Sequence, residues 1–485
     1  RSTAATNPVT RFLVVGDLHY YNIDDNGDPS EARAQRLADD IRRKKIDYDF
    51  IVQVGDLVNC QTGYTPRCYA ECHAEWEGAL RDVKRLFPDK PFLLTPGNHD
   101  WYGGDSWQGG LPCLKAHYLP FMEKELGQPM NGLPLTSFRV NDCCFIFLNH
   151  LGMNPAFDVE TRLLLDRTLS AVERDPSVAR VFAVSHPQLW NVDYFRFHEN
   201  ATLLPRFLQA KKFDAYFSGH IHINSLTARK NDLGMALRQV TAAGTWPPID
   251  EGEMRFHPVP WLTLNPAPSV KLFEDHPADV QSYTVVTASR EKVNVRFEAV
   301  GGGNIGEYEW TGPYETKAVR PADRRWKNDL PARVTQARLY YFPYFADRVL
   351  GGGEPPRVRL NGTDIGALAC NRSFFHTNWG KFFLEVPPEL VRRENTVEIL
   401  NPTGAQFLLR DLSIMAAGSD GVEHFTPVYG KVLSFGDAHF FYMGFGLAHP
   451  GMGIIHSDVG MNVPDELLEC VVPPTDGARI RLAFE

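Results

Sequence analysis

Five short polar motifs in the first half of the chain combine residue types that bind metal ions and transfer protons. In chain order they are Gly16-Asp17-Leu18-His19, Gly55-Asp56, Gly97-Asn98-His99-Asp100, Ser185-His186 and Gly219-His220-Ile221-His222. Imidazole, carboxylate and carboxamide groups without a thiolate form a borderline-to-hard ligand set, which suits ions such as Zn, Mn or Fe. The motifs therefore predict a metal centre, and they leave the identity of the metal open.

Each motif has a simpler structural interpretation when it is taken alone. Asn98 could cap a helix, and His186, which precedes a proline, could be an ordinary loop histidine. The pair His220 and His222 is more specific, because alternate residues of an extended chain point to the same side and can bind two neighbouring ions. All five motifs together, each after an apolar segment, favour the metal centre over the separate structural roles.

The segments around these motifs alternate between strand-length apolar runs and helix-length amphipathic stretches. The predicted strands are 12–15, 50–54, 92–95, 144–148, 181–184 and 215–217. The predicted helices are 30–43, 72–86, 114–126, 159–172 and 201–210. Such alternation indicates βαβ units and a largely parallel sheet. Because ligands of such sheets gather at the carboxyl ends of the strands, the five motifs should converge in space.

The second half of the chain has a β-rich pattern. Segments 237–241, 283–288 and 293–297 are expected to complete a second sheet of the first domain. Three consecutive glycines at 301–303 open a polar stretch that is typical of a linker. Further strands predicted at 337–342, 358–360, 382–386, 396–399 and 407–414 favour a β-sandwich. The predicted division is a catalytic domain at 8–300, a linker at 301–332 and an all-β accessory domain at 333–485.

The ordered motifs resemble the signature of the calcineurin-like metallophosphoesterases, over about residues 10–250. This resemblance implies an α/β four-layer sandwich, in which two packed β-sheets are flanked by helices. It also implies two divalent or trivalent metal ions per chain. Carried over by motif, one ion would be held by Asp17, His19 and His222, the other by Asn98, His186 and His220, and Asp56 would bridge the two.

The resemblance also implies a reaction. Two ions about 3.5–4 Å apart lower the pKa of a bridging water, so a hydroxide is the expected nucleophile. His99 resembles the family's histidine that is not a ligand and that protonates the leaving oxygen. Asp100 would orient His99 through a hydrogen bond, or would only stabilise a helix N-terminus. Because His19 is present and a Tyr is absent from 55–59, an Fe(III)-tyrosinate enzyme of the purple acid phosphatase kind is not expected.

Substrate-binding residues are harder to predict from the sequence. Asn149 and His150 end a strand on the expected side of the sheet and are the first candidates. Other loop candidates, each with packing or solvation as the alternative, are Tyr20, Asn59, Trp101, Tyr102, Asn224, Arg229 and Trp246.

Composition restricts the partners and the compartment. A formal net charge of −9 disfavours long nucleic acids, and no apolar run reaches the ~18 residues of a membrane span. Of the 8 cysteines, six lie in the first half of the chain and two in the second, an even number in each, which permits disulfides in each domain or, as an equal alternative, buried thiols. The chain starts at Arg1 without an initiator Met, so a processed, secreted or periplasmic protein is expected.

The predicted function is hydrolysis of a small or glycan-linked phosphate ester. His19 together with the motif at 97–100 resembles the phosphodiesterase branch of the family, which favours diesters, and a monoesterase is the alternative. An alternative of another class is a carbohydrate- or surface-binding protein with a non-catalytic metal scaffold. Segment 357–414 loosely resembles galactose-binding-like modules, which implies a carbohydrate contact. The natural substrate and the oligomeric state are left open by the sequence.

Overall fold

The computed structural model describes most of the chain. The described residues are 8–21, 29–59, 61–62, 65–66, 69–101, 110–130, 135–149, 155–190, 203–220, 222–244, 271–275, 277, 280–312, 315–320, 326–344, 356–368, 382–402, 407–426, 429, 432–435, 441–443, 446–448, 471–475 and 477–485. Two compact units divide the chain. The first comprises Arg1–Trp190, Asn200–Pro248 and Pro268–Asp323, and the second comprises Asn191–Glu199, Ile249–Ala267 and Arg324–Glu485.

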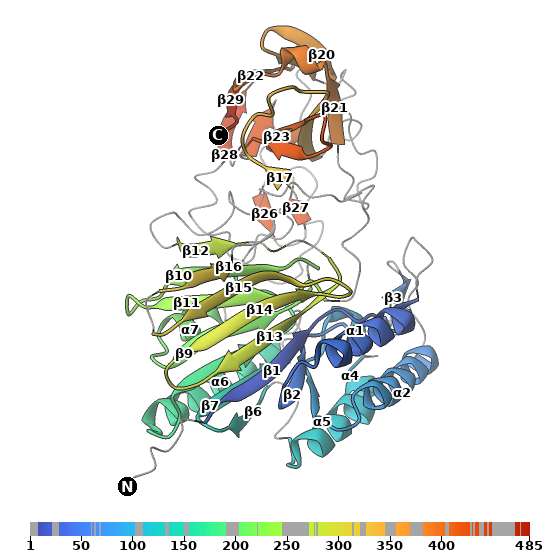
Figure 1. Ribbon diagram of the computed structural model, residues 1–485, viewed down its shortest axis with the longest axis vertical. Helices are drawn as coiled ribbons and strands as arrows, with labels where there is room; N and C mark the ends of the chain where they lie inside the picture. Colours follow the sequence, from blue (N-terminus) through green and yellow to red (C-terminus); the bar gives the residue numbers. More distant parts are fainter. Residues whose placement is uncertain are drawn as a thin grey trace. The chain divides into compact units, whose positions relative to one another are not determined.

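The first unit contains two seven-stranded mixed sheets (Figure 1). The first sheet has the order β16-β15-β14-β13-β1-β2-β5. Its strands are β1 (Thr10–Val15), β2 (Phe50–Gln53), β5 (Phe92–Leu94), β13 (Ser282–Ala288), β14 (Val293–Ala299), β15 (Asn304–Trp310) and β16 (Lys317–Arg320). The strands β1, β2 and β5 are parallel, and the other four extend the sheet from β1 in antiparallel pairs. The carboxyl ends of the three parallel strands therefore share one edge.

The second sheet has the order β12-β10-β11-β9-β8-β7-β6. Its strands are β6 (Leu135–Val140), β7 (Cys143–Leu148), β8 (Arg180–Val184), β9 (Phe213–Ser218), β10 (Ser225–Lys230), β11 (Ala236–Thr241) and β12 (Lys271–Asp275). The four central strands, β7, β8, β9 and β11, run parallel, and the remaining three pair antiparallel at the margins. This sheet also collects the carboxyl ends of its central strands at one edge.

The two sheets pack face to face through apolar side chains. Phe12 of β1 lies at the middle of this core, with its ring stacked on Phe50 of the same sheet at 5.5 Å between centroids. Across the interface its ring meets the edges of Phe145 at 5.1 Å and Phe217 at 5.4 Å. Each of these four rings is buried, and burying an aromatic side chain of this size stabilises the fold by about 1.5–3 kcal/mol. The aromatic pairs thus fix the spacing of the two sheets.

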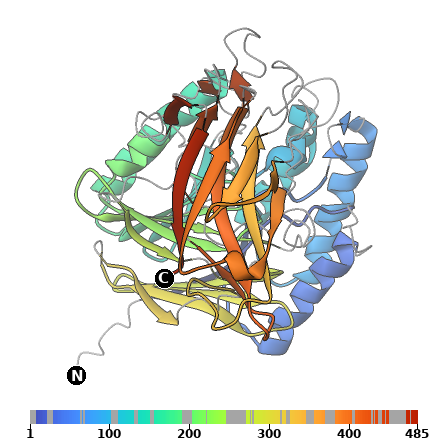
Figure 2. The same cartoon turned by 90° about the horizontal axis from the view of Figure 1, so that it is seen from above.

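Helices cover the outer faces of both sheets. Figures 1 and 2 show α1 and α2 on one side of the sheet pair and α6 on the opposite side. The helices are α1 (Ser30–Lys44), α2 (Tyr69–Leu86), α3 (Asn98–Trp101), α4 (Gly110–Cys113), the π-helix η1 (Leu114–Tyr118), α5 (Leu119–Leu126), α6 (Pro155–Arg174) and α7 (Leu204–Leu208). Helix α1 buries an apolar stripe that includes Ala34, Leu37 and Ile41, at helical spacing. The arrangement confirms the predicted four-layer sandwich of helices and two packed sheets.

A buried charge network joins the second sheet to the extension of the first. Asp214 of β9 accepts hydrogen bonds from Arg180 of β8, from Arg238 of β11 at 2.9 Å, and from the indole of Trp310 in β15 at 2.9 Å. The fully buried Arg238 guanidinium also lies 4.5 Å from the centre of the Trp310 ring. Its Nη2 donates to the backbone carbonyl of Gly312 at 3.0 Å. We call Arg180, Asp214, Arg238 and Trp310 the charge network.

The structure differs from the expected assignment in two places. Of the three segments expected to complete the second sheet, β11 at 236–241 does so, whereas the hairpin of β13 and β14 extends the first sheet beside β1. Residues 301–332, expected to be a linker, contain β15 and β16, which continue the first sheet. Ile305, Tyr308 and Trp310 of β15 are buried there, and the charge network holds the strand. The first unit consequently extends to Asp323.

The second unit is a β-sandwich, as predicted. One sheet has the order β17-β24-β23-β18-β21, with β25 paired to β23 and β28 paired to β25, and the other has the order β20-β19-β22-β29. The first of these sheets contains β17 (Trp326–Lys327), β18 (Gln336–Tyr344), β21 (Phe382–Val386), β23 (Phe407–Ala417), β24 (Glu423–Phe425), β25 (Val432–Phe435) and β28 (Val471–Thr475). The second contains β19 (Arg357–Leu360), β20 (Thr363–Ala367), β22 (Glu394–Leu400) and β29 (Gly477–Ala483). One core cluster joins side chains of both sheets, among them Leu339 and Ile414 from one and Val397 and Leu482 from the other.

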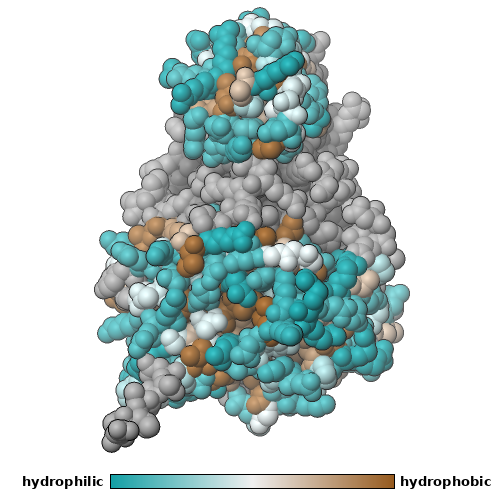
Figure 3. All heavy atoms as spheres, in the orientation of Figure 1, coloured by the Kyte–Doolittle hydropathy of each residue, from teal (hydrophilic) through white to brown (hydrophobic). Residues whose placement is uncertain are grey.

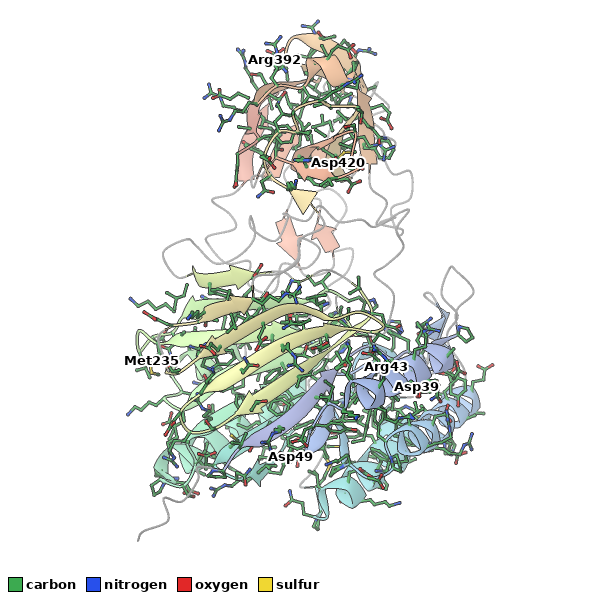
Figure 4. The ribbon with its side chains drawn as sticks, in the orientation of Figure 1. Asp39, Arg43, Asp49, Met235, Arg392 and Asp420 are labelled. Carbon is green, nitrogen blue, oxygen red and sulfur yellow. The ribbon has the colours of Figure 1, made fainter. Side chains whose placement is uncertain are left out.

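The described surface is mainly polar. Figure 3 shows hydrophilic side chains over most of the described area of the visible face, interrupted by small apolar patches. Asp39 and Arg43 project from α1 with more than half of each side chain exposed (Figure 4). In the described part of the chain, no helix combines the length and the apolarity that crossing a membrane would require.

Buried cysteines limit the predicted disulfides. Cys113, Cys143 and Cys144 are free thiols in the interior of the first unit. Burial raises the pKa of Cys113 and Cys143 to about 12 each, so these thiols stay protonated and unreactive. Four other cysteines, at positions 60, 68, 370 and 470, lie outside the described residues.

Candidate metal centre

The predicted site residues follow the carboxyl ends of five strands, and they come from both sheets of the first unit. The first sheet supplies Asp17 and His19 after β1, Asp56 after β2 and the motif at 97–100 after β5. The second sheet supplies His186 after β8, and His220 and His222 after β9. The structure brings these loops together, as the argument from parallel strands predicts.

Four of these residues form a first Asp/His group, made of Asp17, His19, Asp56 and His222. Each offers one ligand atom, and these atoms all lie within 4.8 Å of one another. The Nε2 atoms of His19 and His222 are 3.3 Å apart, and Nε2 of His222 is 3.4 Å from a carboxylate oxygen of Asp17. Imidazole nitrogens and carboxylate oxygens that face one common point are a suitable donor set for a first-row metal ion.

A second Asp/His group consists of Asp56, His186 and His220, again with ligand atoms within 4.8 Å. His186 Nε2 lies 2.9 Å from Nδ1 of His220 and 3.1 Å from Oδ2 of Asp56. The same Oδ2 is 3.7 Å from Nε2 of His19 in the first group. Asp56 therefore lies between the two groups. Asn98 begins α3, but its side chain lies outside the described part of the structure.

The backbone at these residues is strained. Asp17, His19, Asp56, His220 and His222 all have φ between 44° and 76°, in the left-handed region. A residue with a side chain pays about 1 kcal/mol or more to adopt this conformation. Asp17 is stabilised in its position because its carboxylate accepts hydrogen bonds from the backbone N–H of His220, at 3.0 and 3.2 Å to the two oxygens. Such strain concentrated in one set of loops is typical of a functional site.

Two glycines allow the loops to approach one another. Gly55 has φ of 98°, and a Cβ atom there would collide with the ring of His186. At Gly97 a Cβ atom would collide with the carboxylate of Asp56. Glycine in the Gly-Asp and Gly-Asn-His motifs is therefore required by the close packing of the two Asp/His groups.

The charges in the site influence one another strongly. Burial lowers the pKa of His19 well below its usual value, and the neighbouring His99 lowers it further. Burial alone would raise the pKa of Asp56, but the nearby His186 and His99 outweigh it and the pKa falls well below the usual value. Burial would likewise lower the pKa of His186, yet the Asp56 carboxylate raises it to about 9. Metal binding at His186 must therefore displace a proton, because only the neutral imidazole has a lone pair to offer.

His99 lies beside both groups without belonging to either. Its backbone N–H donates to Oδ1 of Asp56 at 2.9 Å, and its ring meets the His19 ring edge-on at 4.7 Å between centroids. The Nδ1 of His99 is 2.7 Å from Oδ1 of Asn59. Because a carboxamide oxygen only accepts, Nδ1 must carry the proton in this contact, and Nε2 is the nitrogen left for proton transfer. The sequence suggested Asn59 only as a substrate contact. The spacing of Asn59 from Asp56 did not reveal that Asn59 would be the hydrogen-bond partner of His99.

Asp100 has a different role from the predicted hydrogen bond to His99. Its carboxylate accepts from the backbone N–H of Val58 at 2.9 Å and of Gly97 at 2.7 Å. Burial raises the pKa of Asp100 to about 8, and the charge of Asp56 adds to this rise. Asn59, and not Asp100, therefore holds the ring of His99. The Asp100 side chain turns back to the loops that carry Asp56 and His99.

The sequence of this region matches one protein family. The match to the calcineurin-like phosphoesterases covers residues 10–224, which contain every residue of the two Asp/His groups. This part of the chain is a calcineurin-like phosphoesterase domain. The predicted recognition is confirmed, and among curated proteins none matches the sequence.

Solved structures with a similar phosphoesterase arrangement are distant in sequence. One is a purple acid phosphatase isolated from yellow lupin (Lupinus luteus) seeds, with 14% identity, a TM-score of 0.45 and 64% of this chain covered. The comparison spans 54% of the lupin chain, so about half of its length. Another is PhoD, with 11% identity and a TM-score of 0.45, where 66% of this chain and 73% of PhoD are covered.

The residues predicted to touch the substrate of the phosphoesterase domain lie mostly in structural positions. Asn149 is fully buried, and its Oδ1 accepts from Tyr118 at 2.8 Å and from Thr95 at 3.3 Å. Tyr20 and Asn224 are also fully buried. Arg229 is nearly buried with its guanidinium over the Trp190 ring at 5.8 Å. His150, Tyr102 and Trp246, with the side chain of Trp101, lie outside the described part of the chain.

Proposed function

We propose that this phosphoesterase domain hydrolyses phosphate esters with two bound metal ions. The observation that carries the proposal is the position of Asp56. Its Oδ2 is 3.1 Å from His186 of one group and 3.7 Å from His19 of the other, so one carboxylate can serve two adjacent ions. The Asp56 carboxylate is buried among the imidazoles of both groups, a donor arrangement that suits two adjacent cations with one shared acidic ligand.

Roles for the individual ligands follow from the two groups. We assign Asp17, His19 and His222 to one ion, and His186 and His220 to the other, with Asp56 between them. Asn98 completes the second set in this proposal. When bound, such ions lower the pKa of a water and neutralise charge that develops on the phosphoryl oxygens. Zn, Mn and Fe all fit these donors, and the proposal does not choose among them.

The protein's own contribution centres on His99. Asn59 holds the Nδ1–H of His99 at 2.7 Å, which turns the opposite ring nitrogen away from Asn59 and keeps one tautomer. We propose that His99 acts as the imidazolium, with both ring nitrogens protonated: it delivers the Nε2 proton to the leaving oxygen of the ester as the P–O bond breaks and is left as the neutral Nδ1–H tautomer. Asp100 holds the Val58 and Gly97 backbone, so the loops with Asp56 and His99 keep their spacing.

Phosphodiesters are the substrates that we propose first. The support is the combination of His19 with the complete motif at 97–100, which resembles the phosphodiesterase branch. The test is turnover of bis-p-nitrophenyl phosphate against p-nitrophenyl phosphate at equal metal loading. A higher kcat/KM for the diester supports the proposal, and a higher value for the monoester replaces it with a phosphatase.

A non-catalytic metal scaffold is the competing function. His99 argues against it, because a scaffold needs the two Asp/His groups but no additional histidine held in one tautomer beside them. The deciding experiment is elemental analysis of the isolated full chain, followed by diester turnover after addition of Mn, Zn or Fe. Two or more ions per chain with release of p-nitrophenol supports the hydrolase. Bound metal without turnover on any phosphate ester would leave only the scaffold.

Two predictions about the biological context remain proposals. We propose a secreted or periplasmic location, which detection of the protein in the culture medium or periplasmic fraction would support and exclusive recovery from the cytosol would overturn.

The second unit is proposed to contact carbohydrate. Phe383 of this unit is 39% exposed and stacks under Arg338 at 4.3 Å, a pairing of an aromatic face with a hydrogen-bond donor that suits sugars. Retention on immobilised glycans, lost in Phe383→Ala, is the measurement.

A further inference from the structure

A pair of histidines lies outside the phosphoesterase centre, between helix α2 and the π-helix η1. Nδ1 of His73 and Nε2 of His117 are in direct contact, and the ring centroids are 4.2 Å apart with an interplanar angle of 57°. His73 is half-buried and His117 is 9% exposed, so the pair lies just under the surface. Neither residue belongs to the motifs that the phosphoesterase domain uses.

The local structure holds His117 towards α2. It lies in Leu114–Tyr118, one turn of π-helix between α4 and α5. Such turns are rare and are frequent at functional sites, because the wider turn redirects side chains from the usual helical register. The indole of Trp76, one turn after His73 in α2, lies parallel to the His117 ring, at 6.4 Å and 3°. His117 is therefore placed by backbone and packing together.

An acidic side chain lies within reach of the pair. Glu77 is four residues after His73 in α2, so both side chains emerge on the same face of the helix. Burial and the neighbouring His73 lower the pKa of His117, and the carboxylate of Glu77 acts in the opposite direction. Glu77 is exposed, which leaves its side chain free to change rotamer. At neutral pH the His117 imidazole is uncharged, the state in which a histidine binds a metal ion.

We propose that His73, His117 and Glu77 bind one divalent transition-metal ion at a second site, separate from the phosphoesterase centre. Two imidazole nitrogens with a carboxylate suit Zn, Ni, Cu or Co, and they discriminate against Mg and Ca, which prefer oxygen ligands alone. Among the described residues, only the two Asp/His groups already bring three ligand atoms within 4.8 Å. Glu77 must therefore turn towards the histidines when the ion binds, and water completes the coordination.

The neighbouring thiols do not join this set. Cys72 is adjacent to His73 in α2, and successive helical residues point about 100° apart. Cys72 is 1% exposed and faces the interior, whereas His73 lies at the margin. Cys113 is equally buried, and burial with the nearby Cys72 raises its pKa to about 12, which disfavours the thiolate that a metal needs.

The second site would connect to the reaction through one indole. Trp76 donates from Nε1 to the backbone carbonyl of Asp100 at 3.0 Å. An ion shared by His73 and His117 would fix α2 against η1, and with them the indole that supports the loop of His99 and Asp100. His73, Glu77 and His117 are thus ligands of a structural ion, and Trp76 is a positioning residue for the loop.

The test counts bound ions in the full chain. Wild type, His73→Ala, His117→Ala and Glu77→Gln are dialysed against equal Ni or Zn, and metal per chain is measured by elemental analysis. We expect the two histidine variants to hold one ion fewer than wild type, and Glu77→Gln to bind that ion at least tenfold more weakly. Glu71→Gln is the matched control, because Glu71 is exposed on the same helix and two residues before His73, on the opposite face.

A conservative variant separates metal binding from a simple hydrogen bond. Gln at position 73 can still hydrogen-bond to His117 but ligates metals poorly, so His73→Gln should keep the folded α2–η1 contact and lose the ion. Far-UV circular dichroism and the melting temperature of the metal-free proteins report folding. Equal metal content in wild type and in folded His73→Gln or His117→Ala would overturn the proposal and leave the pair as a hydrogen bond between two helical segments.

Discussion

Two buried polar clusters in the first unit each contain aspartate among nitrogen-bearing side chains, but they differ in function. In the charge network, the acid Asp214 lies between two bases, and each donor of Arg238 has an acceptor, including a 2.9 Å bond to Asp214. In the Asp/His groups, imidazole nitrogens and carboxylate oxygens converge on one another at short range. Two imidazoles approach to 3.3 Å across the first group, and others to 2.9 Å in the second.

The difference shows how a structural cluster can be distinguished from a binding site. In the charge network every donor of Arg238 has an acceptor, and the Asp214 carboxylate opposes the fall of the Arg238 pKa to about 10 that burial causes. The Asp/His groups sit on left-handed backbone and bring their ligand atoms within 4.8 Å of one another, so a bound cation would add a stabilising interaction to each group.

Removal of the shared carboxylate should have the largest effect. Asp56→Asn keeps the shape but lowers the charge between the two groups, so diester turnover should fall about 10³-fold or more, a loss of about 4 kcal/mol in transition-state stabilisation. Metal content should fall by one or two ions per chain relative to wild type. Steady-state kinetics and elemental analysis on the same samples check both. Turnover within threefold of wild type would remove Asp56 from the mechanism.

Disruption of the charge network should lower the stability of the protein rather than its activity. Asp214→Ala leaves Arg180 and Arg238 buried without their carboxylate, so the free energy of unfolding should fall by about 3–5 kcal/mol. Urea unfolding of the metal-free protein measures the loss. The folded fraction should still bind metal as wild type does, because Asp214 lies outside both Asp/His groups. A normal stability with reduced metal content would reverse the assignment of the two clusters.

Asn59 should affect the reaction by way of His99. Asn59→Ala removes the acceptor at 2.7 Å from Nδ1, so kcat should fall about 10–100-fold, the usual effect of losing a partner that orients a catalytic imidazole. The fall should be larger for esters with alkyl leaving groups than for p-nitrophenyl esters, because alkoxides need the proton more. Asn59→Asp, which can still accept, is the matched variant and should recover most of kcat. An equal fall for both leaving groups would assign Asn59 a purely structural role.

Removal of an exposed ion pair should have the smallest effect on the free energy of unfolding. Arg357 and Asp364 of the second unit form two hydrogen bonds of 2.8 and 2.7 Å, with 53% and 38% of the side chains exposed. Arg357→Ala should lower the free energy of unfolding by less than about 1 kcal/mol, because water screens such pairs. The same urea experiment supplies the comparison with Asp214→Ala. Equal losses at both sites would show that burial does not explain the difference.

Much of the fold could be predicted because its signals are local. The strands around Phe12, Phe50 and Phe182 are short apolar runs, and α1 has a clear apolar stripe, so each appeared within a few residues of its predicted bounds. The partner of a strand is not a local property. The β13–β14 hairpin alternates equally well for either sheet, and only the pairing of β1 with β13, which are far apart in sequence, decides the matter.

The linker was mispredicted for a similar reason. The glycines at 301–303 signal a turn, and the structure does place a turn there, but β15 resumes directly after it. The buried positions of β15 alternate only at Gly306, Tyr308 and Trp310, because Ile305 falls outside that register, and the surrounding polar residues masked so short a pattern. The burial of Trp310 depends on Asp214 and Arg238, which no pattern within the segment reveals.

The candidate site could be predicted where a residue type has few alternative uses. Histidines and aspartates after successive parallel strands converge by topology alone, and the structure gathers six of them. Asn59, Asp100 and Asn149 were harder, because carboxamides and carboxylates also bind backbone groups and hydroxyls. The direction of one side-chain torsion decides which partner they take. Asp100 turned to Val58 and Gly97, and Asn149 to Tyr118 and Thr95.

The origin of the Asp/His residues in both sheets has a mechanical consequence. Each group draws ligand atoms from the first sheet through Asp56 and from the second through His222 or His186. Bound ions would therefore cross-link the two sheets of the first unit, and their binding free energy would add to the free energy needed to separate those sheets. Chelators would then loosen the fold as well as stop the reaction, and release of an ion would be as slow as the parting of the sheets at that edge.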